Sequence, residues 1–451
     1  MERTLQLVVD ACDGTPYGLD PKATFQRVCT DSRQIQPGDL FVALRGEHFN
    51  GNQFAEQALG KGASAVVLDE SIEGLEPCLM VSDGCQALGQ LGAAHRCEFD
   101  LPVIAIAGSN GKTSTKDMLA SILWAQFETL HSEASFNNAI GVPTTLLRLE
   151  PQHQVAVVEL GTNHPGELAP LVNMAVPQYG LLTDIGHEHL EYFGNLEGVA
   201  REEGMLAELL PASGKLFLYG DGDWVKPMIE RSQAPVVTVG FGAANDWRVK
   251  NVRVTESGTR FALHSPIAAL CGDYETPLLG EHQAGNAALA LAVGGGELGM
   301  DRGGMARGLA ATPVPRMRLQ LSERGGVRWL NDAYNANADS TRAALATLAD
   351  LQVDGKRYVV FGEMAELGDH AAEAHQEAGR AAAEMAAGLI AVGQFAEVTA
   401  EAAREAGLAQ VATVLEAKEA VSILRDWLQP GDVVLLKASR VARLEQVEEL
   451  F

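Results

Sequence analysis

A glycine-rich turn between an apolar run and a helical pattern constrains the fold of this chain most strongly. The apolar run 103–106 leads into GSNGKTS, and apolar residues then recur at helical spacing. A strand that feeds such a turn and opens a helix favours phosphate, because backbone N–H groups and the helix dipole both attract an anion. We therefore predict a phosphate-binding loop made of Gly108, Ser109, Asn110, Gly111, Lys112, Thr113 and Ser114.

Two side chains of this turn add chemistry of their own. Lys112 supplies a positive charge, and Thr113 supplies a hydroxyl suited to Mg²⁺. The usual loop places four residues between its first glycine and its Gly-Lys pair, whereas only two separate Gly108 from Gly111 here. An ordinary turn with an exposed lysine is the alternative. The order of strand, glycines, Lys-Thr pair and helix favours the phosphate site.

Length and charge limit the fold class and the partners. A chain of 451 residues exceeds one core and predicts about three domains of roughly 150 residues each. Its 34 basic residues oppose 59 acidic ones, and the net charge of −25 argues against nucleic acid as a partner. Charges are screened beyond about 8 Å at physiological salt, so the loop can still hold phosphate.

Cysteine usage and the start of the chain indicate a compartment. The six cysteines form no CxxC pair, which argues against a zinc site and a disulfide framework and fits a reducing environment. The start lacks a signal-peptide pattern, and no apolar stretch reaches the spanning length of about 18 residues. We expect a cytoplasmic protein that is a monomer and does not insert into a membrane.

The pattern of apolar segments predicts an α/β protein of three domains. Residues 1–82 combine short apolar runs with one helical stretch, as in a small α/β domain. In 83–312, strands alternate with helical segments, which predicts a mostly parallel sheet, and residues 246–279 add an antiparallel annex. In 313–451, strands alternate with alanine-rich helices at 371–388 and 396–406, which predicts a Rossmann-like, doubly wound domain.

Polar residues at strand ends are candidate ligands, because open α/β sheets bind ligands beyond the carboxyl ends of their strands. Glu159 closes the run VAVVEL, where its carboxylate would face the phosphate loop and suit Mg²⁺. HEHLEYFG places His187 and His189 at the next strand end. Solvent-exposed side chains are the alternative for all three. Zinc is disfavoured because no cysteine accompanies the histidines.

Two loops hold polar groups that a core would exclude. FNNAIGVP, at 136–143, places paired asparagines beside a glycine turn. The second loop, NDAYNANADS at 331–340, contains Asp332, Tyr334, Asn335 and Asn337. Turn chemistry alone could explain either loop, but both follow apolar segments, where ligands bind in this class of fold.

These segments occur together in the order found in the Mur ligases, the ATP-dependent amide-forming enzymes of peptidoglycan synthesis. The resemblance spans nearly the whole chain, and the shortened phosphate loop is itself a mark of this family and of folylpolyglutamate synthases. NDAYNAN and the opening TDSRQIQPGDLFVALRGEHFNG resemble the branch that joins D-alanyl-D-alanine to UDP-N-acetylmuramoyl-tripeptide. The segments that carry the resemblance are GSNGKTS, FNNAIGVP, VVELGTN, HLEYFG, GEHQAGNAALA, RMRLQ, NDAYNANADS and LLKASR.

The resemblance implies a reaction and a division of labour. The first domain would hold the UDP-sugar, the central one ATP, and the last the incoming amine. The γ-phosphoryl group of ATP would pass to a substrate carboxylate, and an amine would attack the acyl phosphate to give an amide, ADP and phosphate. ATP and Mg²⁺ are the implied cofactors.

The resemblance also implies roles for single residues. The catalytic set would be Lys112, His189, Arg318, Asn138 and Glu203. Besides the loop and Arg318, ATP would contact His282 and Asn286 at adenine and Asp332 at ribose. The metal ligands would be Thr113, Glu159 and His189. Substrate contacts would come from Ser32, Arg33, Arg45, Tyr334, Asn335 and Asn337.

One departure from the family concerns a lysine that many members carry in a segment like AKAKGEI. CO₂ carbamylates that lysine, which then acts as a carboxylate. Here the segment is GVAREEGML, and alignment on the flanking glycines puts Glu203 at the lysine position. We hypothesise that Glu203 supplies the negative charge without CO₂. A bridging water, a different alignment at Arg201, or an exposed helix glutamate are the alternatives.

Other readings remain open at this point. The acceptor could be that of the diamino-acid-adding sibling or of a folate enzyme, although the opening pattern and the asparagine-rich loop argue against both. A P-loop ATPase acting as a switch, with hydrolysis but no ligation, is the alternative from another class. Because ATP and amine would sit on different domains, we expect closure around Pro313 and Pro315.

Overall fold

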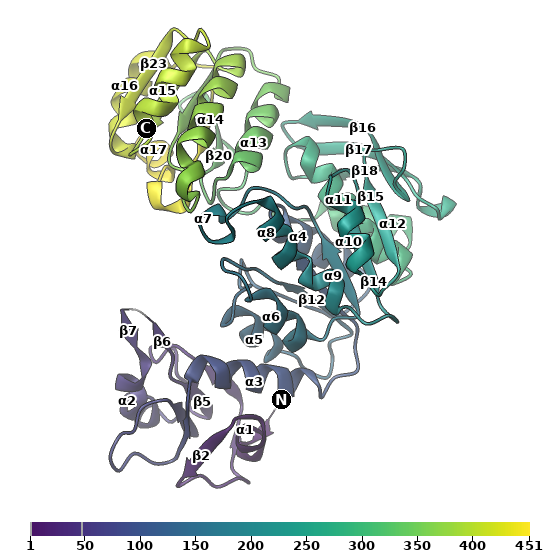
Figure 1. Cartoon of the computed structure of the whole chain (residues 1–451), viewed down its shortest axis with the longest axis vertical. Helices are drawn as coiled ribbons and strands as arrows, with labels where there is room; N and C mark the ends of the chain where they lie inside the picture. The colour runs from purple at the N-terminus through teal and green to yellow at the C-terminus, as the bar shows by residue number, and fades with distance from the viewer. Residues whose placement is uncertain (1, 47) are drawn as a thin grey trace.

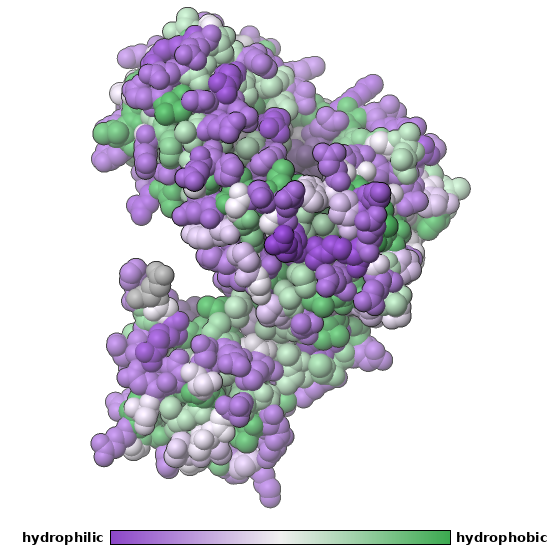
Figure 2. Space-filling model, viewed as in Figure 1, coloured by the Kyte–Doolittle hydropathy of each residue, from purple (hydrophilic) through white to green (hydrophobic). Residues whose placement is uncertain are grey.

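The computed structural model describes residues 2–46 and 48–451, which form three α/β units in chain order. Figure 1 shows the N-terminal unit at one end, the C-terminal unit at the other, and the middle unit between them. Figure 2 shows that this face is hollowed between the N-terminal unit and the rest of the molecule. The predicted α/β class is confirmed. In the described part of the chain, no helix is long and apolar enough to cross a membrane.

The N-terminal unit is built on a small sheet that is mostly parallel. Its strand order is β2-β9-β8-β5-β4, and only the β2–β9 pair is antiparallel. Helix α3, Gly84–Arg96, follows this sheet and packs on α5 (Gly141–Leu146) and α6 (Leu168–Ala175) of the middle unit, so it joins the two units. The strands are β2 (Gly14–Tyr17), β4 (Arg27–Cys29), β5 (Asp39–Val42), β8 (Ala65–Leu68) and β9 (Cys78–Val81).

The middle unit contains a single nine-stranded sheet in the order β11-β12-β10-β13-β14-β15-β16-β17-β18. Pairing is parallel from β11 to β16 and antiparallel from β16 to β18. The antiparallel annex therefore extends the main sheet. The strands are β10 (Val103–Ala107), β11 (Thr129–His131), β12 (Val155–Glu159), β13 (Tyr179–Leu182), β14 (Lys215–Tyr219), β15 (Val236–Gly240), β16 (Trp247–Thr255), β17 (Gly258–His264) and β18 (Gly272–Thr276).

Helices cover both faces of this sheet, so its central strands are apolar throughout. Every residue of β10 and β12 is buried. On one face, α4 (Lys112–Leu123) and α11 (Glu281–Gly296) share a core with Ile104 and Ile106. On the other face, α5 (Gly141–Leu146) and α6 (Leu168–Ala175) pack against the alternate residues of the same strands.

The C-terminal unit is a six-stranded sheet in the order β19-β20-β24-β21-β22-β23, parallel except at β19–β20. This agrees with the predicted doubly wound domain. Its strands are β19 (Gln320–Arg324), β20 (Val327–Asp332), β21 (Arg357–Phe361), β22 (Gly388–Val392), β23 (Gln410–Val414) and β24 (Val433–Lys437). Its longer helices are α13 (Ala338–Asp350), α14 (Ala371–Met385), α15 (Ala396–Glu405) and α16 (Ala420–Trp427).

A short helix of the middle unit ties it to the C-terminal unit. Helix α7, Leu190–Phe193, contributes both of its terminal side chains to the core formed by Met364 and Leu367. Leu190 is 5% exposed and Phe193 is 8% exposed. The two units therefore share apolar contacts as well as polar ones.

Candidate active site

A cavity of about 1160 Å³ opens where the units meet. Its wall includes α3, the phosphate loop, the loops after β12 and β13, the first turn of α11, the segment just before β19 and the loop after β20. The cavity thus lies beyond the carboxyl ends of the central strands, as expected for an open α/β sheet.

The phosphate loop leaves β10 at Ala107 and enters α4 at Lys112, and it needs both of its glycines. Gly108 has φ +114° and Gly111 has φ +83°, in the region that L side chains rarely adopt. A Cβ at Gly108 would lie 2.4 Å from Oγ1 of Thr183, and one at Gly111 would lie 2.7 Å from Oδ1 of Asn286. Asn286 therefore packs directly on the turn.

Two carboxylates hold the backbone of this loop. Gly108 N–H donates to Oε2 of Glu203 at 2.6 Å, and Asn110 N–H donates to Oδ1 of Asp184 at 2.6 Å. Burial raises the pKa of Glu203 to about 8, with repulsion from Glu188 acting in the same direction and Lys112 opposing it. Burial likewise raises the pKa of Asp184 to about 7.

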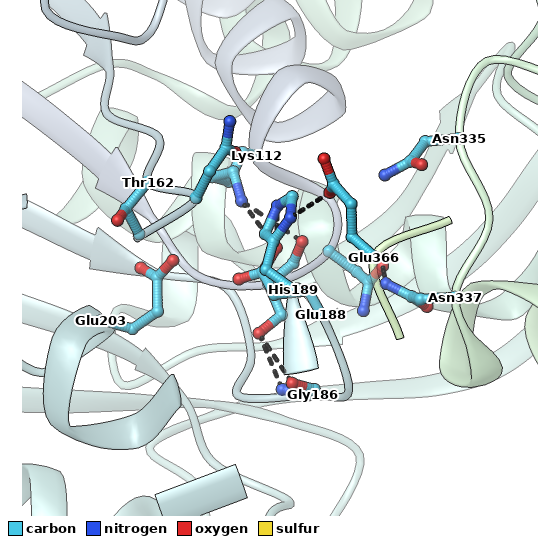
Figure 3. Close-up of polar contacts among 12 residues, drawn as sticks. Lys112, Thr162, Gly186, Glu188, His189, Glu203, Asn335, Asn337 and Glu366 are labelled. Carbon is cyan, nitrogen blue, oxygen red and sulfur yellow. Dashed lines mark hydrogen bonds and ion pairs between the residues drawn. The ribbon is translucent and has the colours of Figure 1, made fainter. Parts of the chain in front are cut away.

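Lys112 folds back over the loop that precedes it. Its Nζ donates to the carbonyl oxygens of Gly108 and Ser109, the latter at 3.3 Å, and lies 3.4 Å from Oε2 of Glu188. Burial opposes the ammonium charge, but Glu188 and three further carboxylates outweigh it and raise the pKa of Lys112. A fixed positive charge therefore lines the cavity. Figure 3 shows Lys112 near His189 and Glu188.

Oxygen atoms suited to a divalent cation gather beside Lys112. Thr113 Oγ1 donates to Oε1 of Glu159 at 3.1 Å, and Nδ2 of Asn137 donates to the same oxygen at 2.9 Å. The other oxygen of Glu159, Oε2, is buried without a hydrogen-bond partner, as is one oxygen each of Glu188 and Glu203. Mg²⁺ takes carboxylate and hydroxyl oxygens, so these residues fit it chemically. No preassembled cluster of three His, Cys, Asp or Glu side chains occurs within the described residues.

The two predicted histidines each meet a carboxylate of the C-terminal unit. His187 Nδ1 lies 2.9 Å from Oδ2 of Asp339, which also accepts the His187 N–H at 2.7 Å. His189, in a left-handed conformation with φ +47°, lies with Nδ1 2.5 Å from Oε2 of Glu366. The hydrogen bond from His189 lowers the pKa of Glu366.

Arg318 and Tyr334 reach the phosphate loop from the C-terminal unit. An Nη2 of Arg318 donates to Oγ1 of Thr113 at 3.3 Å, and its guanidinium carbon lies 4.3 Å from the centre of the Tyr334 ring. Tyr334 donates to Oγ of Ser135 at 3.2 Å. Asn337 donates from Nδ2 to Oδ1 of Asn110 at 3.0 Å.

A second lysine, Lys437, also lines the cavity. Nζ of Lys437, at the end of β24, donates to Oδ2 of Asp332 at 2.6 Å and to the Asn335 carbonyl at 2.9 Å. Burial, with a smaller effect of Lys437, lowers the pKa of His282 to about 4, so this imidazole is neutral at pH 7. The asparagine-rich loop and the first turn of α11 therefore face one another.

Some predicted residues lie elsewhere or have other partners. Ser32, Arg33 and Arg45 do not line this cavity; Arg33 pairs with Asp31 at 2.8 Å, and Arg45 pairs with carboxylates of its own unit. Glu203 lies behind the phosphate loop and is fully buried. Asn138 lines the cavity, and its Oδ1 accepts from the N–H of Gly141 at 2.9 Å.

Five ionisable residues at the site were not predicted from the sequence as site residues: Asp184, Glu188, Asp339, Glu366 and Lys437. Asp184 and Lys437 could have been predicted, because each stands at or just beyond the carboxyl end of a buried strand, where ligands bind. Glu366 could not, because its partner His189 is 177 residues away in sequence.

Family models and known proteins match this chain over nearly its whole length. Family models described as "Mur ligase family, catalytic domain", "Mur ligase middle domain" and "Mur ligase, glutamate ligase domain" match residues 24–96, 106–294 and 316–440. The UDP-N-acetylmuramoyl-tripeptide–D-alanyl-D-alanine ligase of Escherichia coli strain K12 is 37% identical, over 98% of this chain and 97% of its own. Its Bacillus subtilis strain 168 namesake is 32% identical, over 99% and 98%.

Solved structures give the same result. A crystal structure of MurF from Acinetobacter baumannii superposes with a TM-score of 0.92 at 31% identity, covering 100% of this chain and 98% of that one. MurF from Thermotoga maritima, solved in complex with ADP, has a TM-score of 0.83 at 24% identity, covering 94% and 97%, and so shares the fold.

Proposed function

Since the chain belongs to the Mur ligase family, we propose that its cavity joins D-alanyl-D-alanine to UDP-N-acetylmuramoyl-tripeptide at the expense of ATP. The chain is an ATP-dependent ligase of peptidoglycan synthesis. Relatives named for that reaction match it from end to end. One structural observation supports the assignment most directly: Arg318 of the C-terminal unit reaches Thr113 of the phosphate loop, so the two units share one reaction space.

The chemistry requires such a site. A carboxylate is a poor electrophile, and transfer of the γ-phosphoryl group of ATP makes it an acyl phosphate that an amine can attack. Both reactants are anions, so cations must converge where they meet. Lys112 of the middle unit and Arg318 of the C-terminal unit provide those charges. The products are the amide, ADP and phosphate.

We assign the nucleotide to the phosphate loop and the surfaces next to it. Lys112 would contact the β- and γ-phosphates, with Arg318 steadying the γ-phosphate. His282 and Asn286 lie near the loop on α11 and would contact adenine. Neutral His282 suits a base edge, because it adds no charge. Asp332 would contact ribose, and Asn138 the phosphoryl group.

Mg²⁺ fits the acidic oxygens beside the loop. Thr113 and Glu159 would hold one ion; Oε2 of Glu159 has no hydrogen-bond partner, and its nearest cation is Nζ of Lys116 at 4.0 Å. His189 would help to hold a second. The ion, when bound, neutralises charge on the phosphates. Glu203 would take the place of a carbamylated lysine, since it is buried with one oxygen unpartnered.

The other substrates follow from the three units. Residues 1–82 would hold the UDP-sugar through Ser32, Arg33 and Arg45; residues 83–312 would hold ATP; residues 313–451 would hold the amine. D-alanyl-D-alanine would lie near the side chains of Tyr334, Asn335 and Asn337. We propose that the chain works as a monomer in the cytoplasm, a reducing compartment that suits its six free cysteines.

Mass spectrometry of products tests the proposal. ATP, Mg²⁺, UDP-N-acetylmuramoyl-tripeptide and a panel of amines are incubated with the full chain. We expect one ligated product, with D-alanyl-D-alanine, and phosphate release that needs both substrates. Ligation of a diamino acid or glutamate instead would identify another acceptor chemistry. Phosphate release that ignores the amine would identify an ATPase switch.

A further inference from the structure

A hydrogen bond between units sets the orientation of His189. Nδ1 of His189 lies 2.5 Å from Oε2 of Glu366, while Nε2 on the other side of the ring lies 3.9 Å from Oε2 of Glu188. Figure 3 shows the ring between the two carboxylates, with Lys112 alongside. His189 belongs to the middle unit and Glu366 to the loop after β21 of the C-terminal unit.

The segment that carries Glu366 is fastened to the helix that follows His189. The N–H of Glu191 donates to the Glu366 carbonyl at 3.1 Å, and Nε2 of His370 lies 3.2 Å from the Gly194 carbonyl. Leu367 packs in one core with Leu190 and Phe193. Docking of the two units therefore delivers the Glu366 carboxylate to a fixed point beside the ring.

The backbone on both sides of this bond is in an unfavourable conformation. His189 has φ +47° and Glu366 has φ +61°, although neither is glycine. Such a conformation is unfavourable for a residue with a side chain and persists where the surroundings impose it, often at functional sites. An incidental contact between two side chains would not require a positive φ at both residues, so the surrounding structure imposes this pairing.

The chemistry of the pair fixes the imidazole tautomer. An ionised carboxylate only accepts hydrogen bonds, so Nδ1 of His189 must carry a proton. In the neutral ring this leaves the lone pair on Nε2, which faces Glu188. Oε1 of Glu188 is buried without a hydrogen-bond partner, and its Oε2 lies 3.4 Å from Lys112. A nitrogen ligand and an oxygen ligand thus face the same space near the phosphate loop.

We propose that Glu366 is a positioning residue that presents Nε2 of His189 to the cation bound with ATP, so that docking of the C-terminal unit completes this cation site. The proposal rests on the proposed function through the role of His189 as a ligand. Carboxylate partners of this kind orient metal-binding histidines in many proteins, and their loss costs about 10- to 100-fold in metal affinity or activity.

The test compares three variants of the full chain. Glu366→Leu removes the acceptor, Glu366→Gln keeps an amide oxygen in its place, and Glu191→Gln removes an exposed charge of the same region as a control. Nitrogen NMR reports the tautomer of His189, with its signal assigned through His189→Gln. Titration with Mn²⁺ in the presence of ADP, followed by electron paramagnetic resonance, reports cation affinity.

We expect wild type, Glu366→Gln and Glu191→Gln to keep the proton on Nδ1 and to bind Mn²⁺ alike. Glu366→Leu should shift the proton partly to Nε2 and weaken Mn²⁺ binding by about 10- to 100-fold. An unchanged tautomer and unchanged affinity in Glu366→Leu would overturn the proposal and leave Glu366 as an interdomain contact only. Equal losses in Glu366→Gln and Glu366→Leu would also overturn it. Neither readout depends on ligation, so failure of the proposed reaction would be seen separately in the product assay.

Discussion

The loop to which we assign the phosphates of ATP is surrounded by acidic side chains. Glu203 and Asp184 accept its backbone N–H groups, and Glu188 pairs with its lysine. Glu188 is the largest of the influences that raise the pKa of Lys112, and its carboxylate lies beside the ammonium group. Phosphates must therefore bring a cation with them, because carboxylates alone would repel them.

Glu203 gives the first prediction at this scale. If Glu203 replaces a carbamylated lysine, Glu203→Ala should lower turnover about 100-fold and raise the Mg²⁺ concentration needed for half-maximal rate. Wild-type activity should not change when CO₂ and bicarbonate are removed. Rates measured against Mg²⁺ with and without bicarbonate check both points. Unchanged turnover and Mg²⁺ dependence in Glu203→Ala would eliminate this role.

Asp184 gives a prediction about pH. Its pKa is raised to about 7, whereas an unfolded aspartate titrates near 4, so the folded chain holds a proton that the unfolded chain has lost. The contribution of Asp184 to stability is therefore fully present below about pH 4 and is lost as the pH rises to about 7. Over that window the free energy of unfolding should fall by on the order of 1 kcal/mol per pH unit.

The measurement is the urea midpoint of the nucleotide-free chain between pH 5 and 8. Asp184→Asn, whose side chain still accepts from Asn110, should lose less stability over this range than wild type. Asp223→Asn, at an exposed position, serves as the control and should follow wild type. Parallel profiles for Asp184→Asn and wild type would refute the assignment.

The sequence predicts the local part of the site and misses the part made by tertiary contacts. The loop, Glu159 and the histidines follow strands, so each could be placed from its neighbours. Glu366 and Asp339 could not, because they reach the histidines only through docking of two units. The roles assigned to single residues remain predictions.

At the scale of elements, α7 forms the joint between the middle and C-terminal units. Its four residues expose only the two central side chains, and Leu190 and Phe193 enter the neighbouring core. So short a helix has little stability of its own. Its structure therefore depends on the contact with the C-terminal unit.

Phe193→Ala should loosen this joint without unfolding either sheet. Removing a buried phenylalanine costs about 3 kcal/mol, and here the loss falls on docking. Hydrogen exchange followed by mass spectrometry should show faster exchange in 189–194 and 363–370, with β10 and β12 unchanged. Ile229→Ala, at a 43% exposed position of α10 (Val225–Arg231), is the control. Equal acceleration throughout the middle sheet would contradict a local joint.

Strands were predictable where they form continuous apolar runs or a long alternating pattern, whereas β11 and β23 were missed. β10, β12, β21 and β24 are continuous apolar runs. β11 has three residues, and no residue of β23 is fully buried. Their pairing comes from neighbours rather than from their own pattern. Continuity of the annex with the main sheet depends on the β15–β16 pair, which alternation alone does not specify.

At the scale of the whole molecule, the C-terminal unit contacts the phosphate loop. Open space separates the C-terminal unit from the N-terminal unit (Figures 1 and 2). Pro313 and Pro315 lie in the segment between α12 (Arg302–Ala310) and β19. This segment is the candidate pivot for closure.

Small-angle scattering tests closure. The radius of gyration should fall when an ATP analogue, Mg²⁺ and UDP-N-acetylmuramoyl-tripeptide are added together, because the ligands would bridge the open space between the N-terminal unit and the rest of the molecule. UDP alone, which on the proposed assignment would occupy only the N-terminal unit, is the control. A radius that stays constant with the full set of ligands would remove closure from the account.

The central claim is that the cavity activates a carboxylate by phosphorylating it. The direct measurement uses UDP-N-acetylmuramoyl-tripeptide labelled with ¹⁸O in its terminal carboxylate, together with ATP, Mg²⁺ and D-alanyl-D-alanine. If the carboxylate accepts the γ-phosphoryl group, each phosphate released during ligation carries one ¹⁸O from the substrate. Phosphate that contains oxygen from water and none from the carboxylate would contradict the claim.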